Sequence, residues 1–247
     1  MSDEFISKIP PPDFDSHVVA SFGLNEIWHY LDRETLFSTR WQLRQNRSEE
    51  EWKKIVEDVA KPALDRVMEL AIVNEIFQAE AVYAHFKCKR INNGLFIESK
   101  GKSTRFDFPR ERKSPNRCVA DFFDYGFITM MLVTIGNEVQ PFAKNLLKEN
   151  RYTDIFYLKG LAAETTEALA KYIHHEIRKK LNVNEDQGER FSFGYPAAPE
   201  LSYQKKLVNF LDGKGIGISV TKTYHLVPEY STSAIVSIDP NAKRFIP

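Results

Sequence analysis

The run from Arg190 to Glu200 contains the residue types of this sequence that are best suited to chemistry. Its pattern is R-x-x-x-G-Y-P-A-x-P-E, an arginine followed by glycine, two prolines and aromatic side chains. Pro196 and Pro199 lack an N–H donor and have a fixed φ, which excludes a regular helix or a central strand. An arginine fork binds a carboxylate, and a stiff loop can present its backbone to a flat ring. The run predicts either a site for a small anionic or zwitterionic ligand or a structural turn before the next helix.

The composition limits the classes of function. The chain has 247 residues, enough for a sizeable core, and its 34 basic residues balance 34 acidic ones. A balanced charge argues against nucleic acid as the main partner, and no apolar run is long enough to cross a membrane. The first residues lack the pattern of a secretory signal, and the two cysteines have no metal-like spacing. We therefore expect a cytoplasmic protein with no nucleic-acid or membrane partner and no metal site.

The elements that would position the run follow from hydrophobic periodicity and turn residues. Helical spacing predicts two short helices within 24–44, split near Asp32, and longer helices over 48–73, 137–150, 153–181 and 201–211. Ser48 and Glu51 have the spacing of a capping box, and Pro62 should kink the helix that they begin. Strands are predicted over 79–97 with a hairpin at Asn93-Gly94, and over 104–108, 124–135, 216–221 and 233–238. Because strands and helices are segregated, the pattern predicts an α+β fold.

Other polar positions have ordinary structural explanations when each is taken alone. Asp32 is a typical N-cap, and the polar side of helix 153–181 is typical of a solvated face. That side carries Glu164, Glu167, Lys171 and His174. His174 and His175 are adjacent on a helix and point in different directions, which excludes a shared metal site. Neither a GxGxxG phosphate loop nor a nucleophilic triad can be assigned from spacing.

Four segments, taken in order, resemble the S-adenosylmethionine-binding activation domain of cobalamin-dependent methionine synthase. Tyr30-Leu31-Asp32, followed by the aromatic stretch 36–43, matches the N-terminal part of the family. The family's EAFAEYLHxRVR-like helix corresponds to 167–178, and its RPAPGYPACPDH-like loop corresponds to 190–201. Its C-terminal stretch corresponds to 220–240. The resemblance spans most of the chain, and it implies a single domain over 1–247 with an extended N-terminal segment, 1–20. The implied fold is α+β, a curved and mainly antiparallel sheet with surrounding helices.

The resemblance also implies roles for particular residues in binding S-adenosylmethionine. Arg190 corresponds to the family arginine that engages the methionine carboxylate, and Asp32 to the aspartate near the amino group. Glu167 corresponds to a glutamate near the sulfonium, so its side of the helix would line a cleft. The ligand-contacting turn is matched by Gly194 and Tyr195.

Further correspondences are less direct. Pro228 matches another ligand contact, and Glu185 matches a second family glutamate through a one-residue gap. The family has a Tyr-Tyr pair, where the ligand or cobalamin is approached, at the positions of Arg244 and Phe245, so the resemblance places these two residues at the S-adenosylmethionine site as well. The family's PACPDH also becomes Pro-Ala-Ala-Pro-Glu-Leu, without its cysteine and histidine.

The function that the resemblance implies is reactivation of a cobalamin-dependent methionine synthase. This chain, as a standalone protein, would bind S-adenosylmethionine. A partner subunit would supply the cobalamin, and an electron donor such as flavodoxin would reduce it. This chain would contribute positioning and electrostatics and no catalytic acid or base. Two alternatives are a non-catalytic scaffold that keeps the fold, and a methyl-donor-binding component for another corrinoid protein.

Overall fold

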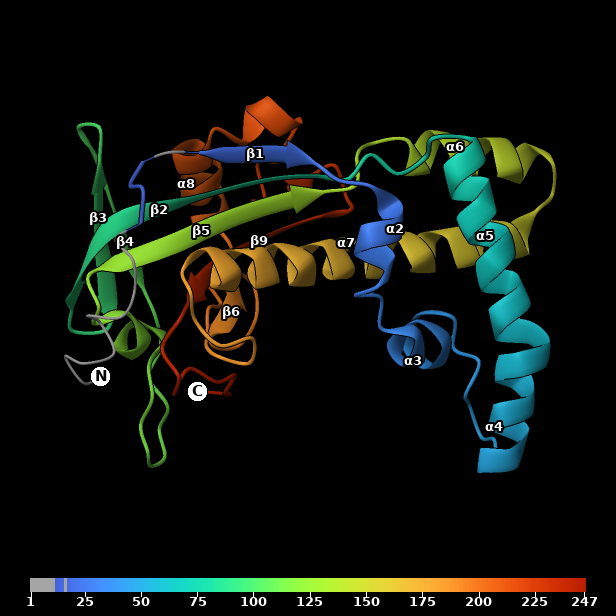
Figure 1. The fold of residues 1–247 in the computed structure, drawn as a ribbon, viewed down its shortest axis with the longest axis horizontal. Coiled ribbons are helices and arrows are strands. Elements are labelled where there is room, and N and C mark those ends of the chain that lie inside the picture. The colour runs from blue at the N-terminus through green and yellow to red at the C-terminus, as the bar shows by residue number, and fades with distance from the viewer. Residues whose placement is uncertain (1–11, 16) are drawn as a thin grey trace.

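An open antiparallel sheet forms the centre of the structure, a computed structural model that describes residues 12–15 and 17–247 (Figure 1). Seven strands pair in the order β4-β3-β2-β5-β9-β6, and β1 pairs with the first half of the long β2. They are β1 (Val18–Ser21), β2 (Glu80–Ile91), β3 (Gly94–Ser99), β4 (Lys102–Asp107), β5 (Phe127–Thr134), β6 (Glu189–Ser192) and β9 (Ser231–Ser237). Every pairing is antiparallel, and helices surround the sheet. The predicted α+β fold is confirmed.

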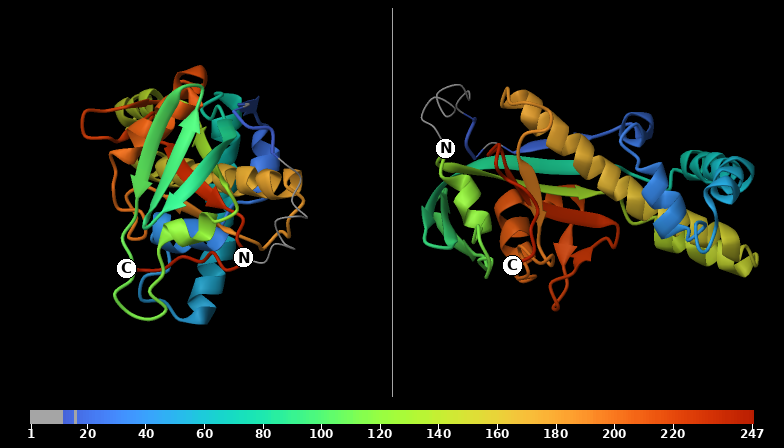
Figure 2. Two further views of the ribbon diagram at one scale, coloured as in Figure 1. Left: turned by 90° about the vertical axis from the view of Figure 1, so that its left-hand side faces the viewer. Right: turned by 90° about the horizontal axis from the view of Figure 1, so that it is seen from below.

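The helices occupy both faces of the sheet and one end of the molecule (Figures 1 and 2). They are α2 (Leu24–Trp28), α3 (Arg33–Thr35), α4 (Glu49–Ile55), α5 (Lys61–Val73), α6 (Val139–Lys148), α7 (Tyr152–Lys180) and α8 (Tyr203–Leu211). Two π-helical segments, Leu36–Arg40 and Val56–Ala60, follow α3 and α4. Two 3-10 helices cover Val119–Phe123 and Gly213–Ile216, and a small ribbon joins β7 (Ser219–Val220) to β8 (Leu226–Val227).

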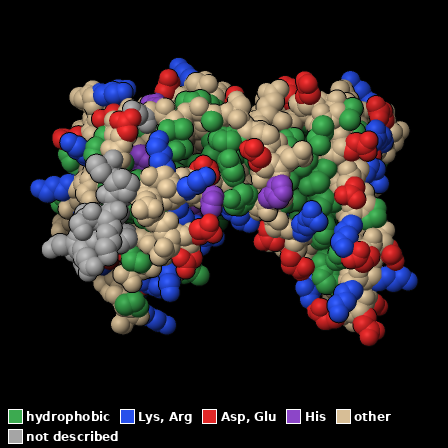
Figure 3. Space-filling model, viewed as in Figure 1, with side chains coloured by type: hydrophobic (Ala, Val, Ile, Leu, Met, Phe, Trp, Pro, Cys, Tyr) green, Lys and Arg blue, Asp and Glu red, His purple; other side chains and the backbone are tan. Residues whose placement is uncertain are grey.

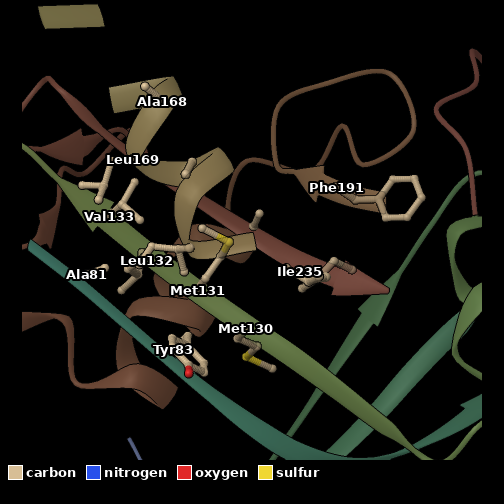
Figure 4. Packing of buried hydrophobic residues seen from close by; sticks show 14 of the residues in the cluster. Ala81, Tyr83, Met130, Met131, Leu132, Val133, Ala168, Leu169, Phe191 and Ile235 are labelled. Atoms are coloured by element: carbon tan, nitrogen blue, oxygen red, sulfur yellow. The ribbon is translucent and has the colours of Figure 1, made fainter. Parts of the chain in front are cut away.

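Strand β5 lies at the centre of the hydrophobic core. All of its residues are buried, as its apolar and β-branched sequence predicts for a strand covered on both faces. Helix α7 packs on one face of the sheet and α8 on the other (Figure 2). In Figure 4, Met131 and Val133 lie close to Leu169 of α7. The long helix α7 is therefore fixed by the sheet together with α5 and α6, which hold its other side toward the cleft described below.

An arm made of α4, a π-helical segment and α5 runs from Glu49 to Val73 beside α7. The predicted capping box is present, with the Ser48 side chain and Glu51 each accepting from the other's backbone N–H. Pro62 lies in the first turn of α5, directly after the π-helical segment. The helix accommodates the proline, which lacks an N–H, where its hydrogen-bond register changes.

Some predicted boundaries were wrong. The β2–β3 turn is formed by Asn92 and Asn93, and Gly94 is already in β3. Only Ser219–Val220 of the predicted strand 216–221 is a strand, since Gly213–Ile216 is a 3-10 helix. The short strands β1 and β6 were not predicted. Within the predicted extended segment 1–20, residues 1–11 and 16 lie outside the described part of the chain, and β1 starts at Val18.

The space-filling view shows a deep hollow between the sheet and the helical arm (Figure 3). Helix α7 bridges the two parts above this hollow (Figure 1). The segment after α2 and the strand β6 approach it from opposite sides, so residues far apart in the sequence face one another there.

Candidate ligand-binding site

A cleft of about 560 Å³ lies along α7 and is lined by four separate parts of the chain. This volume falls in the range of small-molecule sites. The lining residues are Asp32, Thr35 and Arg40; Glu164, Glu167 and Lys171 of α7; 190–192 and 195–198; and Arg244, Phe245 and Ile246. Six residues that the sequence singled out, Asp32, Glu167, Arg190, Tyr195, Arg244 and Phe245, line this one cleft.

Helix α7 contributes two carboxylates and an ammonium group to the cleft. Glu164, Glu167 and Lys171 follow one another at i, i+3 and i+7, a spacing that aligns side chains on one face of a helix. The opposite face packs on β5 and β9. The amphipathic pattern of α7 thus separates the core from a charged cleft wall.

Asp32 is the N-cap of α3, as predicted, and it also lines the cleft. Its Oδ1 accepts from the Thr35 backbone N–H at 2.9 Å, and its Oδ2 accepts from the Thr35 hydroxyl at 2.9 Å. These hydrogen bonds, the backbone one above all, lower the pKa of Asp32. The carboxylate is therefore ionised at neutral pH and is held in a fixed orientation at the cleft edge.

Arg190 lies in β6 and is buried, with its side chain only 6% exposed. It is in an edge strand rather than in the predicted loop, because Glu189–Ser192 pairs with β9. One guanidinium nitrogen, Nη2, donates to Glu167 Oε2 at 2.8 Å. The other, Nη1, is buried and has no hydrogen-bond partner among the described residues. A buried cationic donor without a partner is costly, which makes Nη1 the strongest candidate for an anion contact.

Glu164 contradicts the expected solvated face. Its side chain is 3% exposed, and Oε2 has no hydrogen-bond partner among the described residues. Arg40 Nε lies 3.5 Å from Oε2, and Lys171 Nζ lies 4.0 Å from Oε1. Burial nevertheless raises the pKa of Glu164 and outweighs the attraction of these two cations. The prediction was wrong because the segment around Arg40, more than 120 residues earlier, covers this turn of α7.

His174 also lies away from solvent, again against the predicted solvated face. It is buried, its Nε2 has no hydrogen-bond partner among the described residues, and burial lowers its pKa to about 3. The positive charges of Arg178 and Arg190 act in the same direction. His174 is thus a neutral core residue at physiological pH.

The turn after β6 closes one side of the cleft. The Gly194 N–H donates to the Ala198 carbonyl, and the Ala198 N–H donates to the Tyr195 carbonyl, both at 2.9 Å. Gly194 has a φ of 90°, which favours glycine, and its own atoms do not line the cleft. Ala197 and Ala198 are buried, whereas Tyr195 is exposed at the cleft mouth. The turn therefore presents an aromatic ring on a rigid backbone.

The C-terminal segment closes the cleft beside β6. Arg244 Nε lies 3.4 Å from Glu189 Oε1, and the Arg244 side chain is largely exposed. Phe245 is buried against Phe122, and the Arg117 guanidinium lies over its ring. Arg244 is thus an exposed cation and Phe245 an anchored ring at the cleft wall.

Two predicted contacts lie outside the cleft lining. Glu185 is exposed after α7 and lines a different, smaller pocket with His175 and Arg178. Pro228 is buried after β8, in a part of the chain that contributes nothing to the cleft wall.

Sequence reasoning missed three charged residues of the cleft, Arg40, Glu164 and Lys171. For Glu164 and Lys171 a signal was available, since they share a helix face with Glu167 at i−3 and i+4. Once Glu167 is placed in a cleft, that spacing also places its neighbours there. No comparable local signal marks Arg40.

Comparisons with known proteins identify the family of this chain. A family model described as "Vitamin B12 dependent methionine synthase, activation domain" matches residues 23–246. The chain belongs to this family. The resemblance drawn from the Arg190 run and the three other segments is thereby confirmed.

Individual methionine synthases and a solved reactivation domain are also similar to this activation-domain chain. It is 29% identical to a methionine synthase of Mycobacterium tuberculosis (strain ATCC 25618 / H37Rv), over 95% of this chain and 23% of that protein. It is 28% identical to a methionine synthase of Mycobacterium leprae (strain TN), with the same shares covered. The chain thus spans about a quarter of the length of these relatives. A crystal structure of the MetH reactivation domain bound to AdoHcy superposes with a TM-score of 0.82 at 21% identity, covering 100% of this chain and 86% of that one. Within the described residues, no helix is long and apolar enough to span a membrane.

Proposed function

We propose that this activation domain binds S-adenosylmethionine in the cleft along α7 and supports reductive methylation of a cobalamin carried by a methionine synthase. One observation carries the proposal: a single cleft joins Asp32, Glu167 and Arg190, three residues from segments far apart in the sequence. The structural neighbour bound to AdoHcy, the demethylated form of this ligand, supports the same ligand class.

Arg190 is the proposed partner of the ligand's carboxylate. Its Nη2 is held by Glu167, which fixes the plane of the guanidinium. Its Nη1 is buried and available, and a charge-assisted hydrogen bond from it would compensate the cost of its burial. The carboxylate would thus bind without breaking the ion pair between Arg190 and Glu167.

Asp32 and Glu167 are the proposed acceptors for the ligand's positive charges. Asp32 is ionised and oriented by Thr35, which suits the amino group. Glu167 is partly exposed beside Arg190, which suits proximity to the sulfonium. Tyr195 and Phe245 line the cleft and offer rings to the adenosine, with Gly194 shaping the turn that carries Tyr195. The proposal assigns no ligand contact to Glu185 or Pro228.

A cobalamin held by the cobalamin-binding region of a methionine synthase, and reduced by an external donor such as flavodoxin, would supply the nucleophile that accepts the methyl group. The chain's own residues orient the methyl donor and place carboxylates beside the charged sulfur. Because the sulfonium already activates the methyl group, this chain needs no acid or base.

Calorimetric titration of the purified protein with S-adenosylmethionine tests the proposal. We expect binding by the parent protein and a loss of about 2–4 kcal/mol, or about 30- to 900-fold in affinity, in Arg190→Ala. Arg66→Ala is the matched control, because Arg66 is an exposed arginine that pairs with Asp154 at the far end of α7.

Two results would contradict the proposal. Equal affinities in the parent and Arg190→Ala would remove the carboxylate assignment. Absence of binding with millimolar ligand, in the presence of a cobalamin-binding methionine synthase fragment as well, would favour a scaffold that keeps the fold without the ligand.

A further inference from the structure

Glu164 has the features of a ligand-contacting residue, although nothing in the proposed ligand assignment uses it. Its carboxylate lines the cleft, its side chain is 3% exposed, and Oε2 has no hydrogen-bond partner among the described residues. Buried carboxylates in proteins are usually paired, because an isolated buried charge is costly. Glu164 is therefore a buried acceptor for a cation.

The nearby cations of the protein compensate Glu164 only in part. Arg40 and Lys171 lie 3.5 and 4.0 Å from its oxygens, and neither donates a hydrogen bond to it. Both side chains are about two-fifths exposed, at 40% and 43%, so water screens their charges. Burial still dominates and raises the pKa of Glu164, and the negative charges of Glu167 and Asp32 act in the same direction.

The other two carboxylates of the cleft are already engaged. Asp32 accepts two hydrogen bonds from Thr35, and Glu167 accepts one from Arg190. Glu164 lies one helical turn from Glu167 on the same face of α7. Of the three, Glu164 is the carboxylate that lacks a hydrogen-bonded partner within the described residues.

We propose that Glu164 is a specificity-determining residue that favours the cationic methyl donor S-adenosylmethionine over its neutral thioether product, S-adenosylhomocysteine. A sulfonium cannot donate a hydrogen bond, so a carboxylate with low exposure and no directional partner is suited to it. The two ligands differ by one methyl group and one positive charge. The carboxylate therefore stabilises the donor complex selectively, and this stabilisation is lost when the neutral product forms. This inference rests on the proposed function, and it adds Glu164 to the residues carried over from the family.

The test compares the two ligands on the same variants by calorimetry. Glu164→Gln keeps the shape of the side chain and removes its charge, while Glu69→Gln removes the same charge from an exposed position on α5. We expect Glu164→Gln to lower the ratio of S-adenosylmethionine to S-adenosylhomocysteine affinity at least about tenfold, mainly by weakening the cationic ligand. Glu69→Gln should leave the ratio unchanged.

Other outcomes overturn the inference in distinguishable ways. If Glu164→Gln weakens both ligands equally, or neither, Glu164 has only a structural role and the proposed function stands. If the parent protein binds neither ligand, in the presence of a cobalamin-binding methionine synthase fragment as well, the proposed function falls together with this inference. Lys171→Gln gives an independent measurement should Glu164→Gln fail to fold. Removing that cation should raise the affinity ratio, and an unchanged or lower ratio would contradict the proposal.

Discussion

Replacing Glu164 by glutamine should stabilise the protein in the absence of ligand. The side chain is 3% exposed, its Oε2 has no hydrogen-bond partner among the described residues, and burial raises its pKa above the ordinary value of 4.5. A carboxyl group whose pKa is raised by folding favours the folded state below its unfolded pKa. That contribution is lost as the pH rises through the folded pKa. At pH 7 the ionised group therefore lowers the free energy of unfolding.

The expected size of the effect follows from the general cost of burying a group without a hydrogen-bond partner. Each unit by which folding raises a pKa corresponds to about 1.4 kcal/mol at pH values above both pKa values. A buried group without a partner typically costs about 1–3 kcal/mol, and the new amide also lacks a hydrogen-bond partner. We therefore expect a net gain of about 1–2 kcal/mol at pH 7, which is a rise in Tm of about 2–8 °C for a chain of this size.

Denaturant unfolding at pH 7 and at pH 4, with Glu69→Gln as the control, measures this effect. The gain should be present at pH 7 and vanish below pH 4.5, where the carboxyl group is neutral in the unfolded chain as well. A destabilised variant at pH 7 would refute the reasoning. It would mean that attraction to Arg40 and Lys171 exceeds the cost of burying the charge, and that Glu164 is a structural ion-pair residue.

Two further predictions concern the helix that carries the cleft. His174 is neutral in the folded protein, with a pKa of about 3, and protonates near 6.5 when unfolded. Its contribution to stability is thus complete above pH 6.5 and falls by about 1.4 kcal/mol per pH unit below it. Denaturant unfolding from pH 7 to 5 should show this slope reduced in His174→Gln and unchanged in the exposed His29→Gln; equal slopes would contradict the assignment. Gly160→Ala should destabilise the protein by about 1–3 kcal/mol, because a Cβ there would lie 2.6 Å from the Trp41 ring. Tryptophan fluorescence and denaturant unfolding measure this effect. The stabilisation that glycine to alanine usually gives in a helix would refute the prediction.

The elements with strong local signals could be predicted from the sequence. Strand β5 is continuously apolar and β-branched, and α7 keeps a helical period over 29 residues, so their types follow from pattern alone. The capping box of Ser48 and Glu51 is likewise a local signal. The four-residue strands β1 and β6 lack such signals, since only pairing with β2 and β9 makes them strands.

The family resemblance named residues that the fold brings into one cleft, together with two, Glu185 and Pro228, that lie outside it. Arg190, Glu167 and Asp32 line one cleft, as their proposed shared role requires. The pattern of α7 alone did not reveal that Glu164 is buried, because a helix face toward solvent and one toward a polar cleft have the same composition. The two kinds of face differ here because the segment around Arg40 packs beside Glu164, and the helical period of α7 carries no information about that distant segment.

A structure of the protein crystallised with S-adenosylmethionine tests the central claim most directly. The account predicts the ligand in the cleft along α7, with its carboxylate on Arg190 Nη1, its amino group at Asp32 and its sulfur beside the carboxylates of Glu164 and Glu167. Ligand bound elsewhere, such as in the second cavity lined by Gln204 and Ser233, would contradict it. So would ligand in the cleft with its carboxylate turned away from Arg190.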